Sequence, residues 1–161
     1  MQVLDDIYSM ANLTSNADFI LVFESQCSHK RLMQEGFSRA MPFRFISISG
    51  GGIPGWSTRK FIEILSTVVP TAPILFFGDF DVGATRIFFN YKFGTKRGAN
   101  SPARTSLPKM QFMGLTPDDY YGFDESDLID ISEEEFQLIG KELKKIWVLN
   151  EDDVRTNLVV R

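Results

Sequence analysis

Three short apolar runs constrain the fold of this chain most strongly. They lie at residues 19–23, 43–48 and 74–77, and each is followed by a segment whose apolar side chains have helical spacing. Runs of this length are typical of strands buried on both faces of a parallel sheet. A shorter run at residues 110–113 predicts a fourth strand. The alternation predicts an α/β fold with a central, mostly parallel four-stranded sheet and helices on both faces.

The helices are predicted at residues 28–37, 57–69, 84–91 and 132–147, with a further one from residue 150. Ser28 is the expected N-cap of the first helix, and Ser132 with Glu135 forms a predicted capping box for the fourth. Residues 1–16 are weakly patterned and are expected to lead into the domain. The length of the chain, 161 residues, fits a single domain over residues 17–161.

Composition and charge exclude some classes of protein. With 43% hydrophobic and 24% charged residues, the chain is an ordinary globular protein, and its net charge of −4 argues against holding nucleic acid by bulk charge alone. No apolar run approaches the roughly 20 residues that cross a bilayer, so no membrane partner is expected. The single cysteine, Cys27, favours a reducing compartment. We expect the nucleus in a eukaryote and the cytoplasm otherwise.

Acidic residues follow two of the predicted strands at the point where each strand ends. Glu24 follows the first run, and Asp79 and Asp81 follow the third, one residue apart. Ligands of open α/β sheets bind at the carboxyl ends of the strands, and close carboxylates repel unless a cation or a proton lies between them. Oxygen ligands of this kind suit Mg²⁺. The three acids predict a magnesium site that acts on phosphates, although an acid at a strand end can instead cap the next helix.

A glycine-rich loop offers a rival interpretation. Gly50-x-Gly52-x-x-Gly55 satisfies the dinucleotide-binding pattern after a strand and before a helix. Pro54 and the position of the loop in the second strand unit weigh against it, and the rival leaves Glu24 without a role. No dinucleotide is therefore expected. A flexible connection beside the site and a contact with phosphate stay open as roles for this loop.

Other polar residues are less informative. His29, the only histidine, has no matched nucleophile and is interpreted as a surface or capping residue. Arg59 is expected to be solvated, with phosphate contact as the alternative. The stretch from residue 92 to 109 is rich in Lys and Arg and is expected to be a surface segment that helps a DNA backbone approach.

Four ordered blocks resemble the Toprim domain of topoisomerase VI A subunits and of the related meiotic proteins that make double-strand breaks. The first is residues 19–24 with Arg31-Leu32 following, and the second is Gly50 to Pro54 with residues 58–61. The third is the D-x-D of Asp79 and Asp81, and the fourth is the Y-K-F-G of residues 91–94.

The resemblance implies a Toprim, Rossmann-like fold and a DNA double-strand-breaking transesterase of meiotic recombination or DNA topology. It implies Glu24, Asp79 and Asp81 as the Mg²⁺ ligands, with Glu24 also a catalytic proton donor to the leaving 3′-oxygen. The implied partners are double-stranded DNA, a second copy in a homodimer, and a topoisomerase VI B-like subunit.

Departures from the family pattern keep other functions open. Ser25 and Gly51 stand where the family usually has lysine, and Gly55 where it usually has aspartate. The winged-helix domain that carries the family's nucleophilic tyrosine is absent from this chain, and none of Tyr8, Tyr91, Tyr120 and Tyr121 matches that tyrosine. Whether the chain is an enzyme therefore stays undecided. The alternatives are a non-catalytic module for dimerisation or protein contact, and a stand-alone Mg²⁺-dependent phosphodiesterase.

Overall fold

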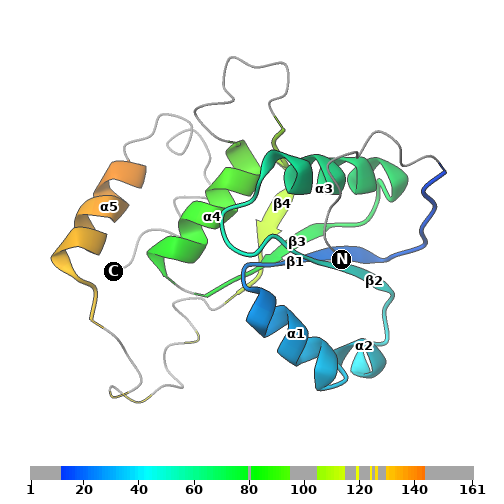
Figure 1. The fold of residues 1–161 in the computed structure, drawn as a ribbon, viewed down its shortest axis with the longest axis horizontal. Coiled ribbons are helices and arrows are strands. Elements are labelled where there is room, and N and C mark those ends of the chain that lie inside the picture. Colours follow the sequence, from blue (N-terminus) through cyan, green and yellow to red (C-terminus); the bar gives the residue numbers. More distant parts are fainter. Residues whose placement is uncertain are drawn as a thin grey trace.

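A computed structural model describes residues 12–79, 81–94, 105–114, 119, 124, 126 and 130–143. Its strands are β1 (Phe19–Phe23), β2 (Phe45–Ser49), β3 (Ile74–Phe77) and β4 (Met110–Phe112). Its helices are α1 (Gln26–Gln34), α2 (Phe37–Ala40), α3 (Trp56–Val68), α4 (Val82–Phe93) and α5 (Glu133–Leu143) (Figure 1).

The four strands form one sheet in the order β2-β1-β3-β4, and every neighbouring pair is parallel. Strand β1 lies inside the sheet, as its wholly apolar sequence predicts, and Ile20 and Val22 are fully buried. In the register, Phe23 at the end of β1 pairs with Ser49 of β2 and Phe77 of β3. The carboxyl ends of these three strands therefore meet at one edge of the sheet.

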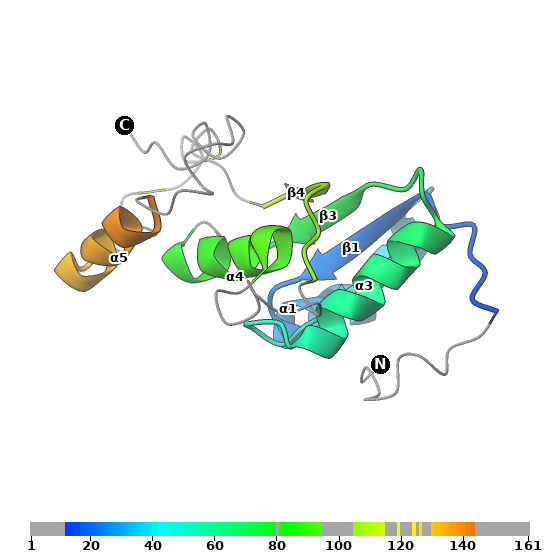
Figure 2. The same cartoon turned by 90° about the horizontal axis from the view of Figure 1, so that it is seen from above.

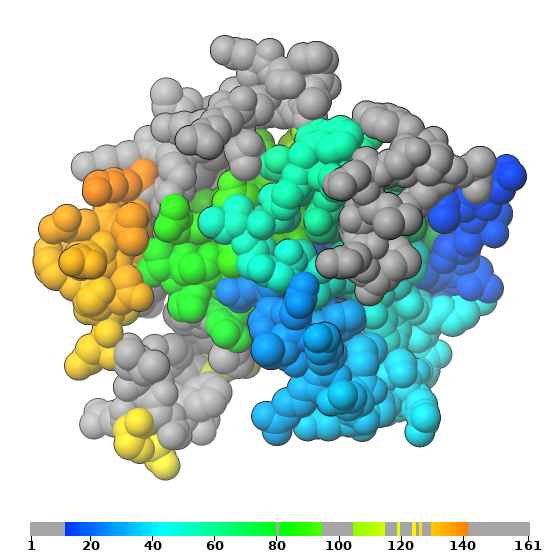
Figure 3. Space-filling view, in the orientation of Figure 1, coloured from blue at the N-terminus to red at the C-terminus, as the bar shows by residue number. Residues whose placement is uncertain are grey.

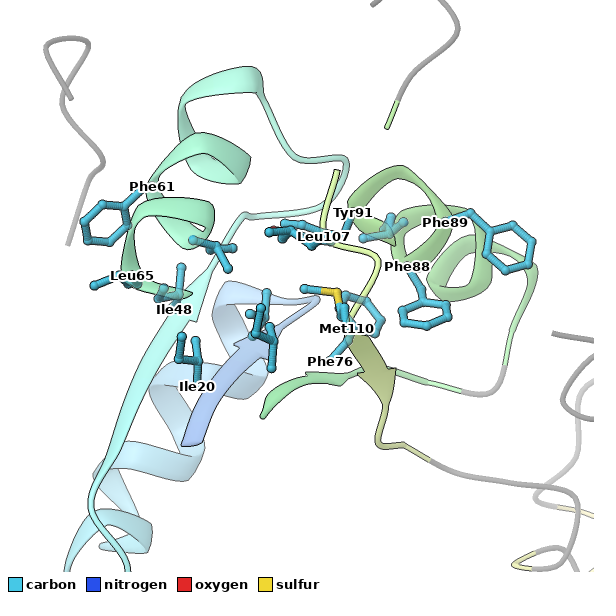
Figure 4. Close-up of a cluster of buried hydrophobic side chains, with 14 of the residues drawn as sticks. Ile20, Ile48, Phe61, Leu65, Phe76, Phe88, Phe89, Tyr91, Leu107 and Met110 are labelled. Atoms are coloured by element: carbon cyan, nitrogen blue, oxygen red, sulfur yellow. The ribbon is translucent and has the colours of Figure 1, made fainter. Parts of the chain in front are cut away.

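Helices cover both faces, which confirms the predicted architecture. Helices α3 and α4 lie on one face, and α1 and α2 lie on the other (Figures 1 and 2). The main core fills the space between the sheet and α3 and α4, with Phe76, Tyr91 and Met110 fully buried at its centre (Figure 4). On the opposite face, the ring of Phe23 packs against His29 of α1, with 4.8 Å between ring centroids.

The structure describes both of the N-terminal caps predicted for the first and fourth helices. Ser25, rather than Ser28, caps α1, because its hydroxyl accepts the amides of Cys27 at 3.1 Å and Ser28 at 3.4 Å. The chain turns into the helix directly after Glu24, so the prediction placed this start too late. The capping box before α5 is confirmed, since the Glu135 amide donates to Ser132 Oγ at 3.3 Å and the Ser132 amide donates to Glu135 Oε2 at 3.0 Å.

The basic stretch differs from its prediction. Lys92 is 6% exposed, and its ammonium lies 5.7 Å from the centroid of the Phe88 ring. Thr105 and Leu107 are also buried, and the Leu107 amide donates to the carbonyl of Tyr91 at 3.0 Å. Helix α4 extends two residues past its predicted end, and residues 105–107 pack back against it. The surface interpretation is therefore wrong for these residues, while Lys96, Arg97 and Arg104 lie outside the described ranges.

Helix α5 lies at the periphery, beside α4 (Figure 3). Its predicted apolar stripe is only partly covered, because Phe136 is 67% exposed. The predicted continuation to Trp147, the helix from residue 150 and residues 1–11 fall outside the described residues. Within the described ranges, no helix has the length and apolar character that crossing a membrane would require.

Candidate metal centre

The strand order predicts a ligand-binding crevice at the carboxyl ends of β1 and β3. From β1 the chain passes to β2 on one side, and from β3 it passes to β4 on the other. Adjacent strands whose connections leave in opposite directions form a topological switch point, where open α/β sheets bind ligands. Glu24 follows β1, and Asp79 and Asp81 follow β3. The structure thus brings the three predicted acids to this one crevice.

Backbone contacts hold Glu24 against the end of β3. Its amide donates to the carbonyl of Phe77 at 2.9 Å, and its carboxylate Oε2 accepts the amide of Asp79 at 3.2 Å. Gly78 makes this approach possible, since a Cβ at Gly78 would lie 3.0 Å from Glu24 Oε2 and 2.7 Å from Phe76 Cε1. Sequence analysis assigned no role to Gly78. A glycine between a buried strand and a D-x-D pair is the signal that could have identified it.

Asp81 caps the helix that follows the site. Its Oδ1 accepts the amide of Ala84 at 2.6 Å, and its carbonyl accepts the hydroxyl of Thr85 at 2.9 Å. The capping role considered from the sequence is therefore real for Asp81. It occupies one carboxylate oxygen and leaves Oδ2 outside these hydrogen bonds, so capping and metal ligation are compatible in this side chain.

Burial and the charges of the two aspartates act on the pKa of Glu24. Burial raises the pKa of Glu24, the nearby charges of Asp81 and Asp79 raise it further, and the Asp79 amide acts in the opposite direction. This is the expected response of carboxylates held close together. Across the described residues, no three His, Cys, Asp or Glu side chains are gathered closely enough to hold a metal ion as they stand.

The donor set nevertheless suits Mg²⁺. All three candidates are carboxylates, and Mg²⁺ binds through a few carboxylates while keeping several waters. Glu24 Oε1 and Asp81 Oδ2 take no part in the backbone hydrogen bonds described above. Asp79 is exposed, and its amide donates to Glu24 Oε2.

An open pocket lies beside Glu24. Its volume is about 360 Å³, and its lining comprises Glu24, Ser25, Gln26, Cys27, Gly51 and Gly52. The loop from Gly50 to Gly55 forms one wall, and the amide of Gly52 donates to the carbonyl of Glu24 at 3.1 Å. The loop follows β2, which is an edge strand and does not border the switch point. This position is a further argument against the dinucleotide-binding interpretation of the loop.

Two other residues differ from their predicted surroundings. His29 neither caps a helix nor lies free on the surface: its Nε2 lies 3.1 Å from Ser47 Oγ, and burial lowers its pKa. Arg59 is 6% exposed and donates through Nη1 to the carbonyl of Asn90 at 3.3 Å, so it is not solvated.

Tyr91 does not present a nucleophile. It is fully buried, and burial raises the pKa of its hydroxyl above the usual range, which keeps the hydroxyl protonated. Tyr8, Tyr120 and Tyr121 lie outside the described residues.

Comparison with known proteins identifies the family of this chain. Residues 19–160 match the family of Toprim domains from the topoisomerase 6 A-subunit/Spo11 group. The chain belongs to this family. The resemblance inferred from the ordered motifs is therefore confirmed, and the four-stranded parallel sheet is that of a Toprim domain.

Relatives of this Toprim domain include meiotic and topoisomerase proteins. The meiotic recombination protein spo-11 of Caenorhabditis elegans is 29% identical over 151 residues, which cover 92% of this chain and 35% of the relative. The A subunit of type 2 DNA topoisomerase 6 from Methanocaldococcus jannaschii is 32% identical over 114 residues, 70% of this chain and 30% of the relative. The human meiotic recombination protein SPO11 is 26% identical over 117 residues, 73% and 29% respectively. The chain spans about a third of the length of these relatives.

Proposed function

We propose that this chain is the Mg²⁺-binding Toprim module of a topoisomerase VI A-like protein that breaks both strands of DNA. The observation that carries the proposal is the meeting of Glu24, Asp79 and Asp81 at the β1/β3 switch point of a Toprim fold. Its relatives include meiotic recombination proteins and a type 2 DNA topoisomerase, which supports DNA as the substrate. We extend the module over residues 17–161.

The chemistry of the site suits a phosphodiester. Bound Mg²⁺ would neutralise non-bridging phosphate oxygens and orient the strand. Glu24 and Asp81 would hold the ion from the two sides of the crevice, and Asp79 would complete the set. The hydrogen bonds of Glu24 and Asp81 to backbone amides hold both residues at the switch point, and their side chains would have to converge when the ion binds. We also propose Glu24 as the proton donor to the leaving 3′-oxygen.

The module needs further parts to break DNA. We propose that the nucleophilic tyrosine is supplied by a winged-helix domain, acting across a homodimer, and that a topoisomerase VI B-like subunit joins the assembly. Buried Tyr91 is unsuited to that role. We propose that the protein acts in the nucleus if its organism is a eukaryote, and in the cytoplasm otherwise.

Calorimetric titration with Mg²⁺ tests the metal proposal. Glu24→Gln, Asp79→Asn and Asp81→Asn each remove one charge with little change in shape, and each is expected to weaken Mg²⁺ affinity at least tenfold. Asp18→Asn is the matched control, because Asp18 precedes the same strand β1 at the opposite end, where its carboxylate pairs with Arg44. It should bind Mg²⁺ as the wild type does. Equal affinity in all five proteins, or none in the wild type at millimolar Mg²⁺, would reject the proposal.

A non-catalytic module is the second candidate. Two observations favour it: the acids are not gathered into a cluster within the described residues, and Ser25, where the family usually has lysine, is committed to capping α1. This candidate predicts no Mg²⁺ binding and a stable self-association that the charge variants leave unchanged. Both candidates predict self-association, so sedimentation alone does not separate them. The Mg²⁺ titration of the wild type does, because only the first candidate predicts binding.

A stand-alone Mg²⁺-dependent phosphodiesterase is the remaining alternative. It predicts hydrolysis of DNA by this chain alone, lost in Asp81→Asn and retained in Asp18→Asn. The first candidate predicts no cleavage by the chain alone.

A further inference from the structure

The glycine loop, Gly50 to Gly55, is tied to one turn of α4 at both of its ends. At its start, Gly50 lies directly against the hydroxyl of Tyr91, so close that a Cβ at Gly50 would overlap Tyr91 Oη. Just beyond its end, Arg59 in the first turns of α3 donates to the carbonyl of Asn90. Asn90 and Tyr91 are adjacent, so two consecutive residues of α4 contact the start of the loop and the helix that follows it. Figure 4 shows Tyr91 on α4, facing the core.

The polar groups at these two contacts are unusual. Tyr91 is fully buried and Arg59 is 6% exposed, yet within the described residues Tyr91 Oη and Arg59 Nε have no hydrogen-bond partner. A buried polar group without a partner is costly, because it loses its bonds to water and gains none. Phenylalanine would place the same ring in the core without that cost. The contact that the hydroxyl does make is its packing against Gly50.

A backbone hydrogen bond connects the glycine loop to Glu24. The amide of Gly52 donates to the carbonyl of Glu24 at 3.1 Å, and Gly51 and Gly52 have φ angles of 68° and 102° that other residues rarely adopt. Helix α4, which carries Tyr91, begins at its N-cap Asp81. One rigid helix thus connects Asp81 to the loop that supports Glu24.

We propose that Tyr91 is a positioning residue for the metal centre. Its hydroxyl, packed against Gly50, sets the position of the glycine loop at which Gly52 bonds to Glu24. The part of this inference that concerns Mg²⁺ rests on the proposed function. The part that concerns the loop stands on the contacts alone.

Reciprocal substitutions test the contact between Tyr91 and Gly50. Gly50 does not have a positive φ, so Gly50→Ala introduces only the overlap with Tyr91 Oη. Tyr91→Phe removes the hydroxyl and leaves a gap under the loop. In the double variant the new methyl fills that gap, since the Cβ would lie 3.5 Å from Tyr91 Cζ, an ordinary van der Waals distance. Gly55→Ala is the control, because nothing lies within 4 Å of a Cβ there.

The main readout is hydrogen exchange of the Gly52 amide, followed by NMR, with the melting temperature measured in parallel. Each single variant should accelerate this exchange at least fivefold, and the double variant should return it to within twofold of the wild type. Tyr91→Phe should do so without lowering the melting temperature, a separation that a purely structural role would not give. Mg²⁺ affinity should follow the same pattern, and Gly55→Ala should change neither readout.

Two results would overturn the positioning role. One is unchanged Gly52 exchange in Tyr91→Phe, and the other is a double variant that exchanges as fast as Tyr91→Phe. Both comparisons remain valid if Gly50→Ala alone fails to fold. If the wild type binds no Mg²⁺ while the exchange pattern holds, the proposed metal function fails and the loop contact stands.

Discussion

Glu24 is the residue on which most of the contacts at the site converge. Its carboxylate accepts the amide of Asp79, its carbonyl accepts the amide of Gly52, and its amide donates to Phe77. Its position beside two further acids could be predicted only on the condition that the two strands are neighbours, because acids at the ends of neighbouring parallel strands meet. Gly78 could have been identified from its place between a buried strand and the D-x-D pair. The contact of Tyr91 with Gly50 could not, since it depends on a distance of closest approach that no pattern of residue types encodes.

His29 gives a prediction at the same scale. Burial lowers its pKa below the ordinary value of 6.5, so the folded chain binds this proton less readily than the unfolded chain does. Its contribution to stability is therefore present above pH 6.5 and is lost as the pH falls below that value. An NMR titration of the imidazole, the only one in the chain, should give a pKa below 6.5. A value at or above 6.5 would contradict the assigned burial.

A variant checks the link between His29 and stability. His29→Gln removes the titrating group and keeps a polar atom near Ser47. The loss of unfolding free energy between about pH 7 and about pH 5.5, a window that spans the ordinary pKa of histidine, should be smaller in this variant than in the wild type. An equal loss would assign the pH dependence to other groups.

At the scale of elements, the apolar runs located the strands well and the helix ends less well. Residues 19–23 and 74–77 match β1 and β3, because a strand buried on both faces admits few polar residues. Helix α1 begins before its predicted N-cap, since Ser25 and Ser28 are equally good capping residues and only the tight turn after Glu24 selects Ser25. The extension of α4 to Phe93 was missed because a lysine is ordinarily exposed, whereas Lys92 is buried with its ammonium near the rings of Phe88 and Phe93.

Helix α4 has its own test at Asp81. Asp81→Ala removes the side-chain cap and should cost about 1 kcal/mol of unfolding free energy. Asp81→Asn retains an oxygen that can cap the Ala84 amide, so it should unfold at nearly the same denaturant concentration as the wild type. Both variants should lose Mg²⁺ affinity. Chemical denaturation without Mg²⁺ measures the capping role, and calorimetric titration with Mg²⁺ measures the ligand role. If Asp81→Asn destabilised the chain as much as Asp81→Ala, the proposed division between cap and ligand would be wrong.

At the scale of the whole molecule, the strand order decides where a ligand can bind. The sequence predicts parallel strands but not that β1 and β3 are neighbours, because hydrophobic runs carry no information on which strand pairs with which. The order β2-β1-β3-β4 brings Glu24 to the two aspartates and makes the crevice between them the binding edge. The exposed side of α5, with Phe136 on it, belongs to the same scale, and its apolar pattern did not reveal how much of it α4 would cover.

The central claim is that a divalent cation binds at the β1/β3 switch point, and paramagnetic mapping with Mn²⁺ as a substitute for Mg²⁺ tests it most directly. In the spectrum of the ¹⁵N-labelled chain, substoichiometric Mn²⁺ should broaden the amides of Glu24, Gly78, Asp79 and Asp81 first, and excess Mg²⁺ should reverse the effect. Broadening that begins at the acidic first turn of α5, Glu133 to Glu135, or that is spread evenly over the surface, would contradict a metal centre at the switch point.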